Sequence, residues 1–516
     1  MKRVKLFLLL LFPSALYAQQ QYRGQVVDSA TGSPIAGVSV IIAGSTRGVS
    51  SEVDGSFTLS AKQGDRLQVS SIGYQSQTYT LGSDLSFIVR LSASAANELN
   101  QVVVIGYGTQ RKIDVTGSVA QISGDQIAKQ GVVNPLSGLQ GKVAGVQVTN
   151  NGAPGTSPQV IIRGLGTFEA NASPLYVVDG VWLNDISFLN PNDIESTSIL
   201  KDASSEAIYG VRGANGVVII TTKKGANHLT VNYNGSVGVQ IAQHVPKMAN
   251  GEQYATMINE LTRLNGGTDI LDSSRFGTGT NWFDEELRHA LMTNHQVSVN
   301  GGGEKSTYNV SLGYLGQDGI LQTNNYKRYT GSFNNDIKIS RFIKFGYNIV
   351  GSYSKSHDAP GAIWRDLYTA PPIISPFSPL STNNPDGIYG NSDVYGLGSS
   401  VANPAAAIAY NNATTQTYNL TGNAYVDINF AKHFVWHTSV GGTYINAESQ
   451  SFTPIYQVSA SQINSQNTLS EGQLSTKNWS VENTLTYSNQ FGDNKITVLV
   501  GQSAYRNYYD ESYASR

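Results

Sequence analysis

The side chains best suited to chemistry are few and scattered in this chain of 516 residues. Seven histidines are present and cysteine is absent, so the sequence offers no thiolate nucleophile and no disulfide. His433 and His437 lie four positions apart and would share one face of a strand, but two imidazoles do not complete a metal site. Nucleophile-elbow, zinc-protease, phosphate-loop and dinucleotide motifs do not occur. The sequence therefore predicts no catalytic residue, no metal and no cofactor, and a protein that is not an enzyme.

Two arginines, each followed by a glycine, are the best candidates for a specific polar contact. They are Arg163 with Gly164 and Arg212 with Gly213. A guanidinium presents a planar fork of donors that pairs bidentately with a carboxylate, so such a pair can lock two parts of a protein together. The alternative is that both arginines pair only within their own domain.

Composition indicates an exported, mainly β protein. A basic start at residues 2–5, an apolar run over 6–12 and small residues up to Ala18 predict a secretory signal peptide over residues 1–18. Charged residues make up 14% of the chain, below the roughly 25% of ordinary soluble domains. The formal net charge of −2 leaves no basic footprint for nucleic acid. No later apolar run suits a membrane helix, so a membrane location requires a closed β-barrel.

Residues 19–92 read as short strands separated by turn residues. The stretch GQVVDSATGSPIAGVSVIIAGSTRGVSSEVDGSF, followed by SSIGY, places strand-like runs between clusters of Gly, Pro and Asp. This pattern predicts a small β-sandwich. The same residues resemble the carboxypeptidase-regulatory-like domain, which carries no catalytic residue. Two roles stay open: an interaction or spacer module in the periplasm, or a domain that only adds stability.

Residues 93–113 read as a linker with one strand-prone stretch. Small and polar residues lead into four branched apolar residues and a GYG sequence: Val102, Val103, Val104, Ile105, Gly106, Tyr107 and Gly108. A β-prone stretch in a flexible segment has unpaired backbone groups, so it can add to the edge of a partner's sheet. The alternative is a strand buried in the protein's own fold.

Residues 114–226 combine short strands and helical turns. GVQVTN, QVIIRG and PLYVVDGV read as strands, and GVVIITTKK as a closing strand. Asn192 or Asp193 is placed to cap a short helix through DIESTSILKD, with acidic residues near its start to suit the helix dipole. ASSEAIYG predicts a helical turn that ends at Gly210, and Asp179–Gly180 a tight turn with glycine at positive φ. We therefore expect a mixed α/β domain.

Residues 227–516 are dominated by an alternation of apolar and polar residues. An apolar outer face and a polar inner face are typical of a transmembrane antiparallel β-barrel, whereas a soluble sandwich would have shorter strands and more uniform connections. GEQYATMINELTRL, in the first long connection, predicts an amphipathic helix. The alternation predicts about nine strands with short and long connections in turn, near residues 229–242, 294–302, 305–317, 326–339, 341–355, 415–430, 432–446, 476–489 and 493–507.

The middle of the chain also resembles a known family. LQGKVAGVQV, IRGLGT, PLYVVDGV and LNPNDIESTSILKDASSEAIYGVRGANGVVIITTKKG match, in order and spacing, the plug domain of SusC-type TonB-dependent outer-membrane transporters (SusC/RagA-like family). The resemblance implies that residues 114–226 fill the lumen of a large barrel. It implies that VVVIGYG acts as the TonB box, with Val102 to Tyr107 binding TonB. It also implies that Arg163, Gly164, Arg212 and Gly213 contact barrel carboxylates.

The strand count implies that residues 227–516 are the N-terminal part of a longer barrel. In plugged outer-membrane transporters the barrel is closed and has about 22 strands, an even number. About nine strands would leave open edges, which do not persist in lipid. We therefore expect an N-terminal fragment of such a transporter.

The family resemblance implies energised import across the outer membrane. TonB and its inner-membrane complex would pull on the plug, a SusD-type surface lipoprotein would cover the barrel, and the solute would be an oligosaccharide. A peptide importer of the same architecture is the alternative, and a TonB-linked signalling receptor is a third. Four aromatic residues of a long loop either stack on sugar rings or pack within the loop: Tyr368, Phe377, Tyr389 and Tyr395.

Overall fold

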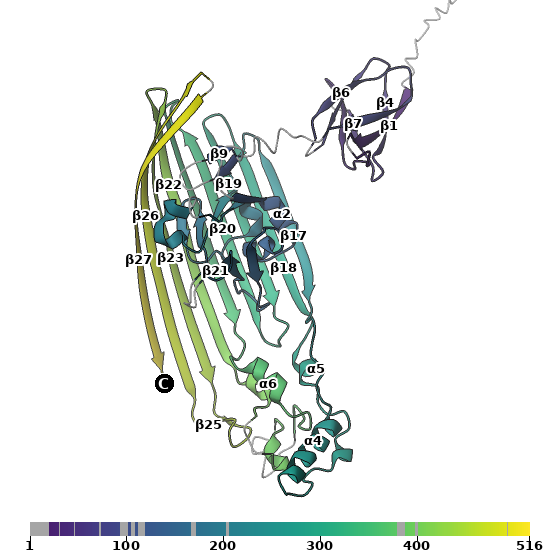
Figure 1. The fold of residues 1–516 in the computed structure, drawn as a ribbon, viewed down its shortest axis with the longest axis vertical. Helices are drawn as coiled ribbons and strands as arrows, with labels where there is room; N and C mark the ends of the chain where they lie inside the picture. The colour runs from purple at the N-terminus through teal and green to yellow at the C-terminus, as the bar shows by residue number, and fades with distance from the viewer. Residues whose placement is uncertain are drawn as a thin grey trace, which may run out of the picture. The chain divides into compact units, whose positions relative to one another are not determined.

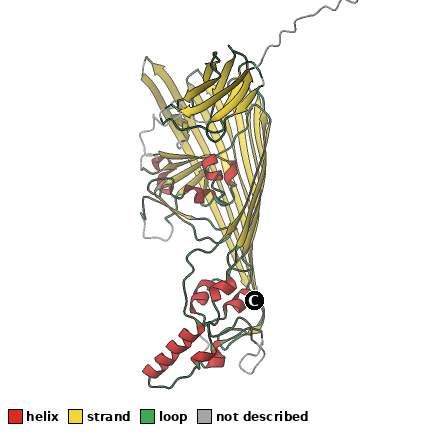
Figure 2. Cartoon of the chain, turned by 90° about the vertical axis from the view of Figure 1, so that its right-hand side faces the viewer, coloured by secondary structure: helices red, strands yellow, loops and turns green. Residues whose placement is uncertain are grey.

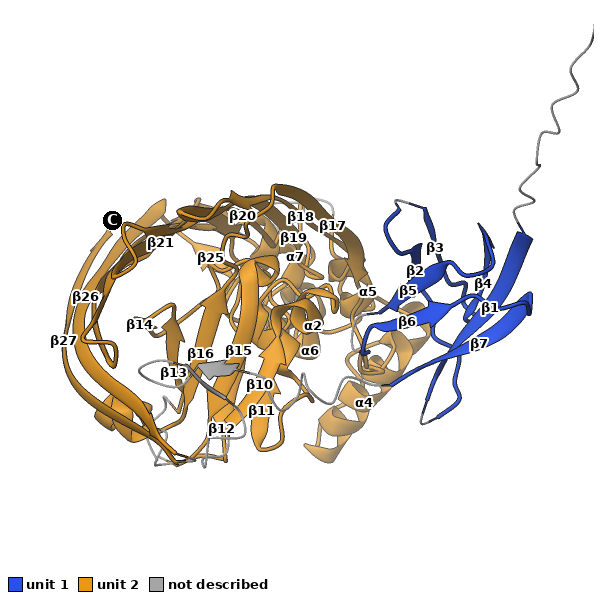
Figure 3. Cartoon of the chain, turned by 90° about the horizontal axis from the view of Figure 1, so that it is seen from above, with its two compact units in different colours: residues 1–103, 110–116 blue, residues 104–109, 117–516 orange. Residues whose placement is uncertain are grey.

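A computed structural model describes most of the chain. The described residues are 20–29, 31–45, 47–71, 74–92, 102–104, 109–111, 119–166, 172–202, 206–378, 388–397, 401–492 and 494–516. They fall into two compact units, which Figure 3 shows in different colours. The predicted signal peptide lies outside the described residues, and so do Ile105, Gly106 and Tyr107. Within the described ranges, no helix is long and apolar enough to cross a membrane.

The first unit is a β-sandwich, as the sequence predicts. One sheet has β1 (Gln20–Asp28) at its centre, antiparallel to β4 (Ser56–Ala61) and parallel to β7 (Ser86–Leu91). The other sheet has the order β3-β2-β5-β6, with bounds Gly48–Ser50, Ser39–Ile42, Arg66–Ser70 and Gln77–Thr80. Alternate residues of the strands point inward and form a single buried core that includes Tyr22, Val40, Phe57, Leu67, Val69 and Val89.

The strand-prone stretch of the linker is extended in the structure. Residues Val102–Val104 form β8, which pairs with β9 (Thr109–Arg111) in a two-stranded sheet. The pair must be antiparallel, because a parallel pair needs a crossover of about a dozen residues or more.

Residues 119–226 form the plug, a mixed α/β domain (Figure 1). Its main sheet has the order β10-β15-β16-β13-β14, in which β13 and β16 are parallel and the other neighbours antiparallel. The bounds are β10 (Val119–Ser123), β13 (Leu175–Val178), β14 (Val181–Leu183), β15 (Ile194–Leu200) and β16 (Val217–Thr222). The remaining elements are β11 (Val146–Thr149), β12 (Gln159–Ile162), α2 (Gly124–Ala128), η2 (Pro135–Leu139), η3 (Pro191–Asp193) and η4 (Ala207–Gly213).

The prediction of a helix through DIESTSILKD is wrong. Residues 194–200 form strand β15, which pairs with β10 on one side and β16 on the other. A central strand that is buried on both faces does not alternate between apolar and polar residues, so its sequence looks like that of a buried helix. The helix-start signal just before it then favours the helix. That signal marks a real cap, but only of the short 3-10 turn η3, and the capping side chain is Asn190, which accepts from the N–H of Asn192.

Nine antiparallel strands of the described chain form one large sheet, the wall. They pair in sequence order, so β17 and β27 each have a single neighbour. Figure 1 shows the short turns at one end of the wall and the long connections at the other. The wall strands are β17 (Thr230–Gln240), β18 (Ala290–Gly302), β19 (Ser306–Asp318), β20 (Asn325–Lys338), β21 (Ile343–His357), β22 (Asn412–Phe430), β23 (Phe434–Thr453), β26 (Thr468–Phe491) and β27 (Asn494–Ser515).

The wall reverses the burial pattern of a soluble protein. On β22, Asn419 and Thr421 are buried, whereas Tyr418 and Leu420 are about half exposed, at 47% and 54%. Other strands repeat this pattern, with buried Gln296 beside exposed Val297 on β18. A soluble sandwich would bury the apolar set, so the pattern matches a sheet with lipid on its outer face. Figure 3 shows the wall curving with its concave face around the plug.

The long connections of the wall fold into a compact cap with its own core (Figure 2). The predicted amphipathic helix is confirmed as α4 (Gly251–Leu264), which begins with a capping box between Asn250 and Gln253. The other cap elements are η5 (Ser273–Arg275), α5 (Trp282–Glu286), α6 (Ile363–Thr369), η6 (Ser392–Tyr395), α7 (Pro404–Ala409), β24 (Tyr456–Gln457) and β25 (Ile463–Asn464). Their core, which the sequence patterns do not predict, includes Leu271, Trp282, Phe283, Ile363, Leu367 and Ile408.

Candidate plug–wall interface

A buried aspartate of the plug meets polar side chains of the wall. Asp193 ends the turn η3 and is 6% exposed. Its Oδ1 accepts a hydrogen bond from Gln296 Nε2 of β18 at 2.5 Å. Burial raises the pKa of Asp193, while Ser311, Gln296 and the positive charges of Lys223 and Arg328 act in the opposite direction.

A second, half-buried aspartate, Asp179, sits at the tip of the β13–β14 hairpin. Asp179 and Gly180 both have positive φ, 45° and 90°, which suits the two central positions of a tight hairpin turn. The Asp179 carboxylate accepts from the Thr222 N–H at 3.0 Å and from its hydroxyl at 2.6 Å. On the wall side, Asn423 Nδ2 donates to the Asp179 carbonyl at 2.7 Å. Burial also raises the pKa of the Asp179 carboxyl.

Wall side chains also bind the plug backbone directly. Arg328 of β20, 3% exposed, donates through Nη1 to the carbonyl of Ser187. Asn334 of the same strand donates to Thr222 Oγ1 at 2.7 Å and to the Lys223 carbonyl at 3.1 Å. The interface is therefore a set of polar contacts that join amide side chains and the Arg328 guanidinium of the wall to side-chain and backbone oxygens of the plug. Such contacts fix orientation strongly but each contributes only about 0.5–1.5 kcal/mol net.

Arg212 lies where the plug meets the last wall strand. Its guanidinium carbon is 4.3 Å from the ring centroid of Tyr505 on β27, and its Nη2 donates to Asn184 Oδ1 at 2.9 Å. Gly213 is buried, and a Cβ there would lie 2.9 Å from the Glu206 carbonyl. The contact that the structure gives Arg212 with the wall is thus a cation–π contact with an aromatic ring.

Arg163 occupies a different environment. It is exposed and adopts a φ of 57°, and Gly164 follows with a φ of 87°. Its positive charge acts on Glu206, a neighbour within the plug. The structure therefore separates the two arginines, and a wall contact of Arg163 stays a prediction.

The valines of the linker precede the plug in the chain, and the two histidines bond to residues of the wall. Val102, Val103 and Val104 form β8, outside the plug. His437 Nδ1 lies 2.6 Å from Asp427 Oδ1 on the neighbouring strand. His433 lies at the adjacent turn, with its Nδ1 3.2 Å from the Ser488 carbonyl. Among the described residues, no group of three or more metal-ligating side chains is found.

The sequence does not predict the anchoring role of Asp193 and Asp179. Its local pattern marks Asp193 as a helix-start residue and Asp179 as a turn residue, and neither assignment concerns a distant partner. The partner of Asp193 lies 103 residues further along the chain, and that of Asp179 lies 244 residues further. The sequence could still indicate such contacts as a group, because the polar residues on the inner face of the alternating strands must face the plug.

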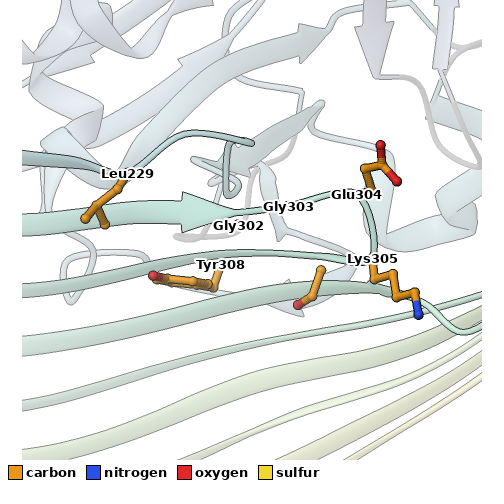
Figure 4. A pocket seen from close by; sticks show the side chains of 7 residues that line it. Leu229, Gly302, Gly303, Glu304, Lys305 and Tyr308 are labelled. Carbon is orange, nitrogen blue, oxygen red and sulfur yellow. The ribbon is translucent and has the colours of Figure 1, made fainter.

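One hollow of the described surface is shallow and open. It occupies about 690 Å³ at the turn between β18 and β19 and is lined by Leu229, Gly302, Gly303, Glu304, Lys305, Ser306 and Tyr308 (Figure 4). Each of these residues is exposed or half-buried. It therefore lacks the enclosed, convergent polar groups of a ligand site.

Two family models match the chain. The TonB-dependent receptor plug domain matches residues 111–217, and the CarboxypepD_reg-like domain matches residues 22–104. The first match covers the domain that the wall surrounds. A plug held on the polar, concave face of an antiparallel sheet with an apolar outer face defines a TonB-dependent receptor of the outer membrane.

Comparison with individual proteins narrows the class. The chain is 35% identical to a TonB-dependent receptor of Formosa agariphila, over 95% of this chain and 50% of that protein. It is 34% identical to the TonB-dependent receptor SusC of Bacteroides thetaiotaomicron, over 96% of this chain and 51% of that protein. The solved RagAB peptide importer in its open-open state aligns with a TM-score of 0.66 and 26% identity, over 80% of this chain and 50% of that one. The chain belongs to the SusC-like TonB-dependent receptors, and it spans about half the length of the curated relatives it matches.

Proposed function

We propose that this protein takes part in TonB-dependent import of a large solute, an oligosaccharide, across the outer membrane. The observation that carries the proposal is the plug, which the concave face of the wall holds through polar contacts at Asp193 and Asp179. A plug that only sealed the barrel would gain more from apolar packing. Polar contacts can be exchanged for water when work is supplied, and this suits a closure that must open and reform.

TonB is the proposed source of that work. In the proposal it grips residues 102–107 by adding a strand at the β8 stretch, because backbone pairing of this kind needs little side-chain specificity. The pull then passes along the chain into β10, the first strand of the plug. A SusD-type surface lipoprotein is the proposed partner over the cap, which offers a folded platform at the long-loop end of the wall.

Exposed aromatic rings support a ring-bearing solute. Trp364 and Tyr368 lie one turn apart on α6 and are 46% and 52% exposed, and Phe377 is 64% exposed. Large exposed aromatic side chains that gather on one part of a surface commonly mark a binding region. Tyr368 also packs edge-on against Phe283, so packing and binding are compatible at this position.

A peptide is the second candidate solute. It is favoured by the structural similarity to the RagAB peptide importer. The two candidates are separated by binding to the purified receptor, in which calorimetry with a panel of oligosaccharides and a panel of peptides should give heat with the first and none with the second. The reverse result would replace the oligosaccharide by a peptide.

The import step itself is tested in cells. Deletion of residues 102–105 should abolish uptake of the bound solute while leaving receptor abundance and solute binding unchanged. A replacement of the same length by Gly and Ser controls for the change in linker length. Uptake that survives both changes would contradict import driven through this stretch.

A further inference from the structure

A polar cavity lies between the plug and the first two wall strands. It occupies about 480 Å³, within the range of small-molecule sites in proteins. Figures 1 and 3 both show α2 on the concave side of the wall beside β17 and β18. The plug contributes residues of α2, η3 and the end of β16, and the wall contributes inward residues of β17 and β18. Its polar members include Asp125, Asn192, Lys223, Asn234, Ser236 and Asn294.

One wall residue of the cavity has an unused acceptor. Asn294 is 9% exposed, and its Oδ1 is buried with no hydrogen-bond partner among the described residues. Buried amide oxygens are rarely left without a donor, because the loss costs about as much as a hydrogen bond. This oxygen is enclosed in the present structure, so an O–H or N–H of a solute would reach it, and supply that donor, when the cavity widens. Asp125 and Lys223 pair with each other, and the neutral side chains of Asn192, Asn234 and Ser236 outnumber the one other charged lining residue, Lys129, which favours an uncharged polar solute.

An ion pair closes the plug side of the same cavity. Lys223 Nζ lies 3.3 Å from Asp125 Oδ1, and the two side chains are 30% and 73% exposed. Ion pairs this exposed contribute little, about 0–1 kcal/mol. Asp125 belongs to α2, which follows β10 and therefore receives any pull on the preceding linker first. Lys223 instead follows β16, which the wall holds through Asn334.

We propose that this cavity is a station on the solute's path past the plug, where Asn294 accepts a hydrogen bond from an uncharged hydroxyl- or amide-bearing solute and the Asp125–Lys223 pair acts as the latch. The inference rests on the proposed import function and adds the route. A pull on the linker moves α2 away from the wall, breaks the weak latch and widens the cavity. The anchors at Asp193 and Asp179 keep the rest of the plug on the wall.

The first test changes the acceptor alone, in the full protein in its own outer membrane. Asn294→Leu keeps the side-chain size and removes the acceptor, so the solute concentration for half-maximal uptake should rise about two- to tenfold, as loss of one hydrogen bond predicts. Asn294→Asp keeps an oxygen acceptor and should be closer to the wild type. Equal uptake parameters in the Leu variant and the wild type would overturn the role of Asn294.

The second test blocks the route. Ser236→Trp fills the cavity from β17, and Ser503→Trp places the same ring on the inner face of β27, opposite Glu482 in the register. We expect the first variant to lose uptake at least tenfold with unchanged solute binding at the cell surface, and the second to keep it. Unimpaired uptake in Ser236→Trp would place the route elsewhere. Absence of TonB-dependent uptake in the wild type would instead reject the import function itself.

The third test addresses the latch. Asp125→Asn and Lys223→Gln should each raise the ion leak through the purified protein in a planar bilayer, because the cavity then opens without a pull. The charge exchange Asp125→Lys with Lys223→Asp should return the leak to the wild-type level. A leak that is unchanged in the single variants, or unrestored by the exchange, would remove the pair from the mechanism.

Discussion

Replacement of Asp193 by alanine tests whether polar anchors hold the plug. The change removes the acceptor of Gln296, which is 2% exposed and would keep a buried, unpaired amide. Such a loss costs about 1–3 kcal/mol, and Arg328 loses a nearby opposite charge as well. Relief of the buried carboxylate acts against the loss of charge beside Arg328, so we expect the plug to open more easily by about 1–3 kcal/mol.

The matched variant is Asp193→Asn, which keeps an oxygen at the same place without the charge. We expect it to cost about 1 kcal/mol or less, because the Gln296 hydrogen bond survives. The assay is hydrogen exchange of the backbone amides of β15 and β16, since a multidomain membrane protein has no single unfolding free energy. In the alanine variant these amides should exchange about 5- to 150-fold faster. Equal exchange in the alanine and asparagine variants would refute the anchoring argument.

The same site has a pH dependence of known sign. Burial raises the pKa of Asp193 above 3.8, so the folded plug holds the proton more tightly than the unfolded chain does. The stabilising contribution is complete below 3.8 and is lost as pH rises through the folded-state pKa. The asparagine variant should lack this dependence. A wild-type plug whose opening is equally pH-independent would contradict the raised pKa.

Three further predictions concern other sites. Gly124→Ala should loosen α2, because the new Cβ would lie 1.7 Å from the Ile194 carbonyl oxygen. Protease cleavage within residues 119–166 should therefore accelerate, and an unchanged cleavage rate would refute that close contact. Arg212→Ala should weaken the attachment of the plug to the last wall strand by about 1–3 kcal/mol, because the contacts to Tyr505 and Asn184 are lost. The measurement is hydrogen exchange of the β14 amides, which should be fastest in the Ala variant and intermediate in Arg212→Lys. Identical exchange in the two variants and the wild type would contradict this role of Arg212. Burial, with the charge of Glu285, raises the pKa of Glu286 to about 7, so the cap should lose stability as pH rises through 7 and Glu286→Gln should not; a pH-dependent Gln variant would exclude Glu286 as the cause.

The wall and the sandwich are predictable because their signal is local. Alternation with a period of two reports directly which side chains share a face, and it predicts all nine wall strands, although β23, β26 and β27 extend further than expected. It also distinguishes the outer face correctly, since the exposed side chains of β22 and β23 include Leu420, Trp436 and Val440.

The plug is harder to predict because its central strand carries no period. Every residue from Thr197 to Leu200 is buried, and such a run fits a helix or a strand equally well until its neighbours are known. The cap core escapes prediction for a related reason. Its apolar residues come from separate loops, such as Trp282 and Ile408, and each loop alone contains too few of them to predict a core.

Seven residues, 223–229, connect the last strand of the plug to the first strand of the wall. These connecting residues lie close against the wall: a Cβ at Gly225 would come within 2.1 Å of the Tyr308 nitrogen of β19, and Asn334 of β20 binds the Lys223 carbonyl. The plug is thus tied to the wall at its C-terminal end, and in the proposed import it is drawn from its N-terminal end. A displaced part of the plug stays covalently attached to the wall, so its effective concentration at its binding surface is about millimolar. Rebinding is therefore an intramolecular step. In the proposed import, the plug would therefore reset after each event without an added energy source.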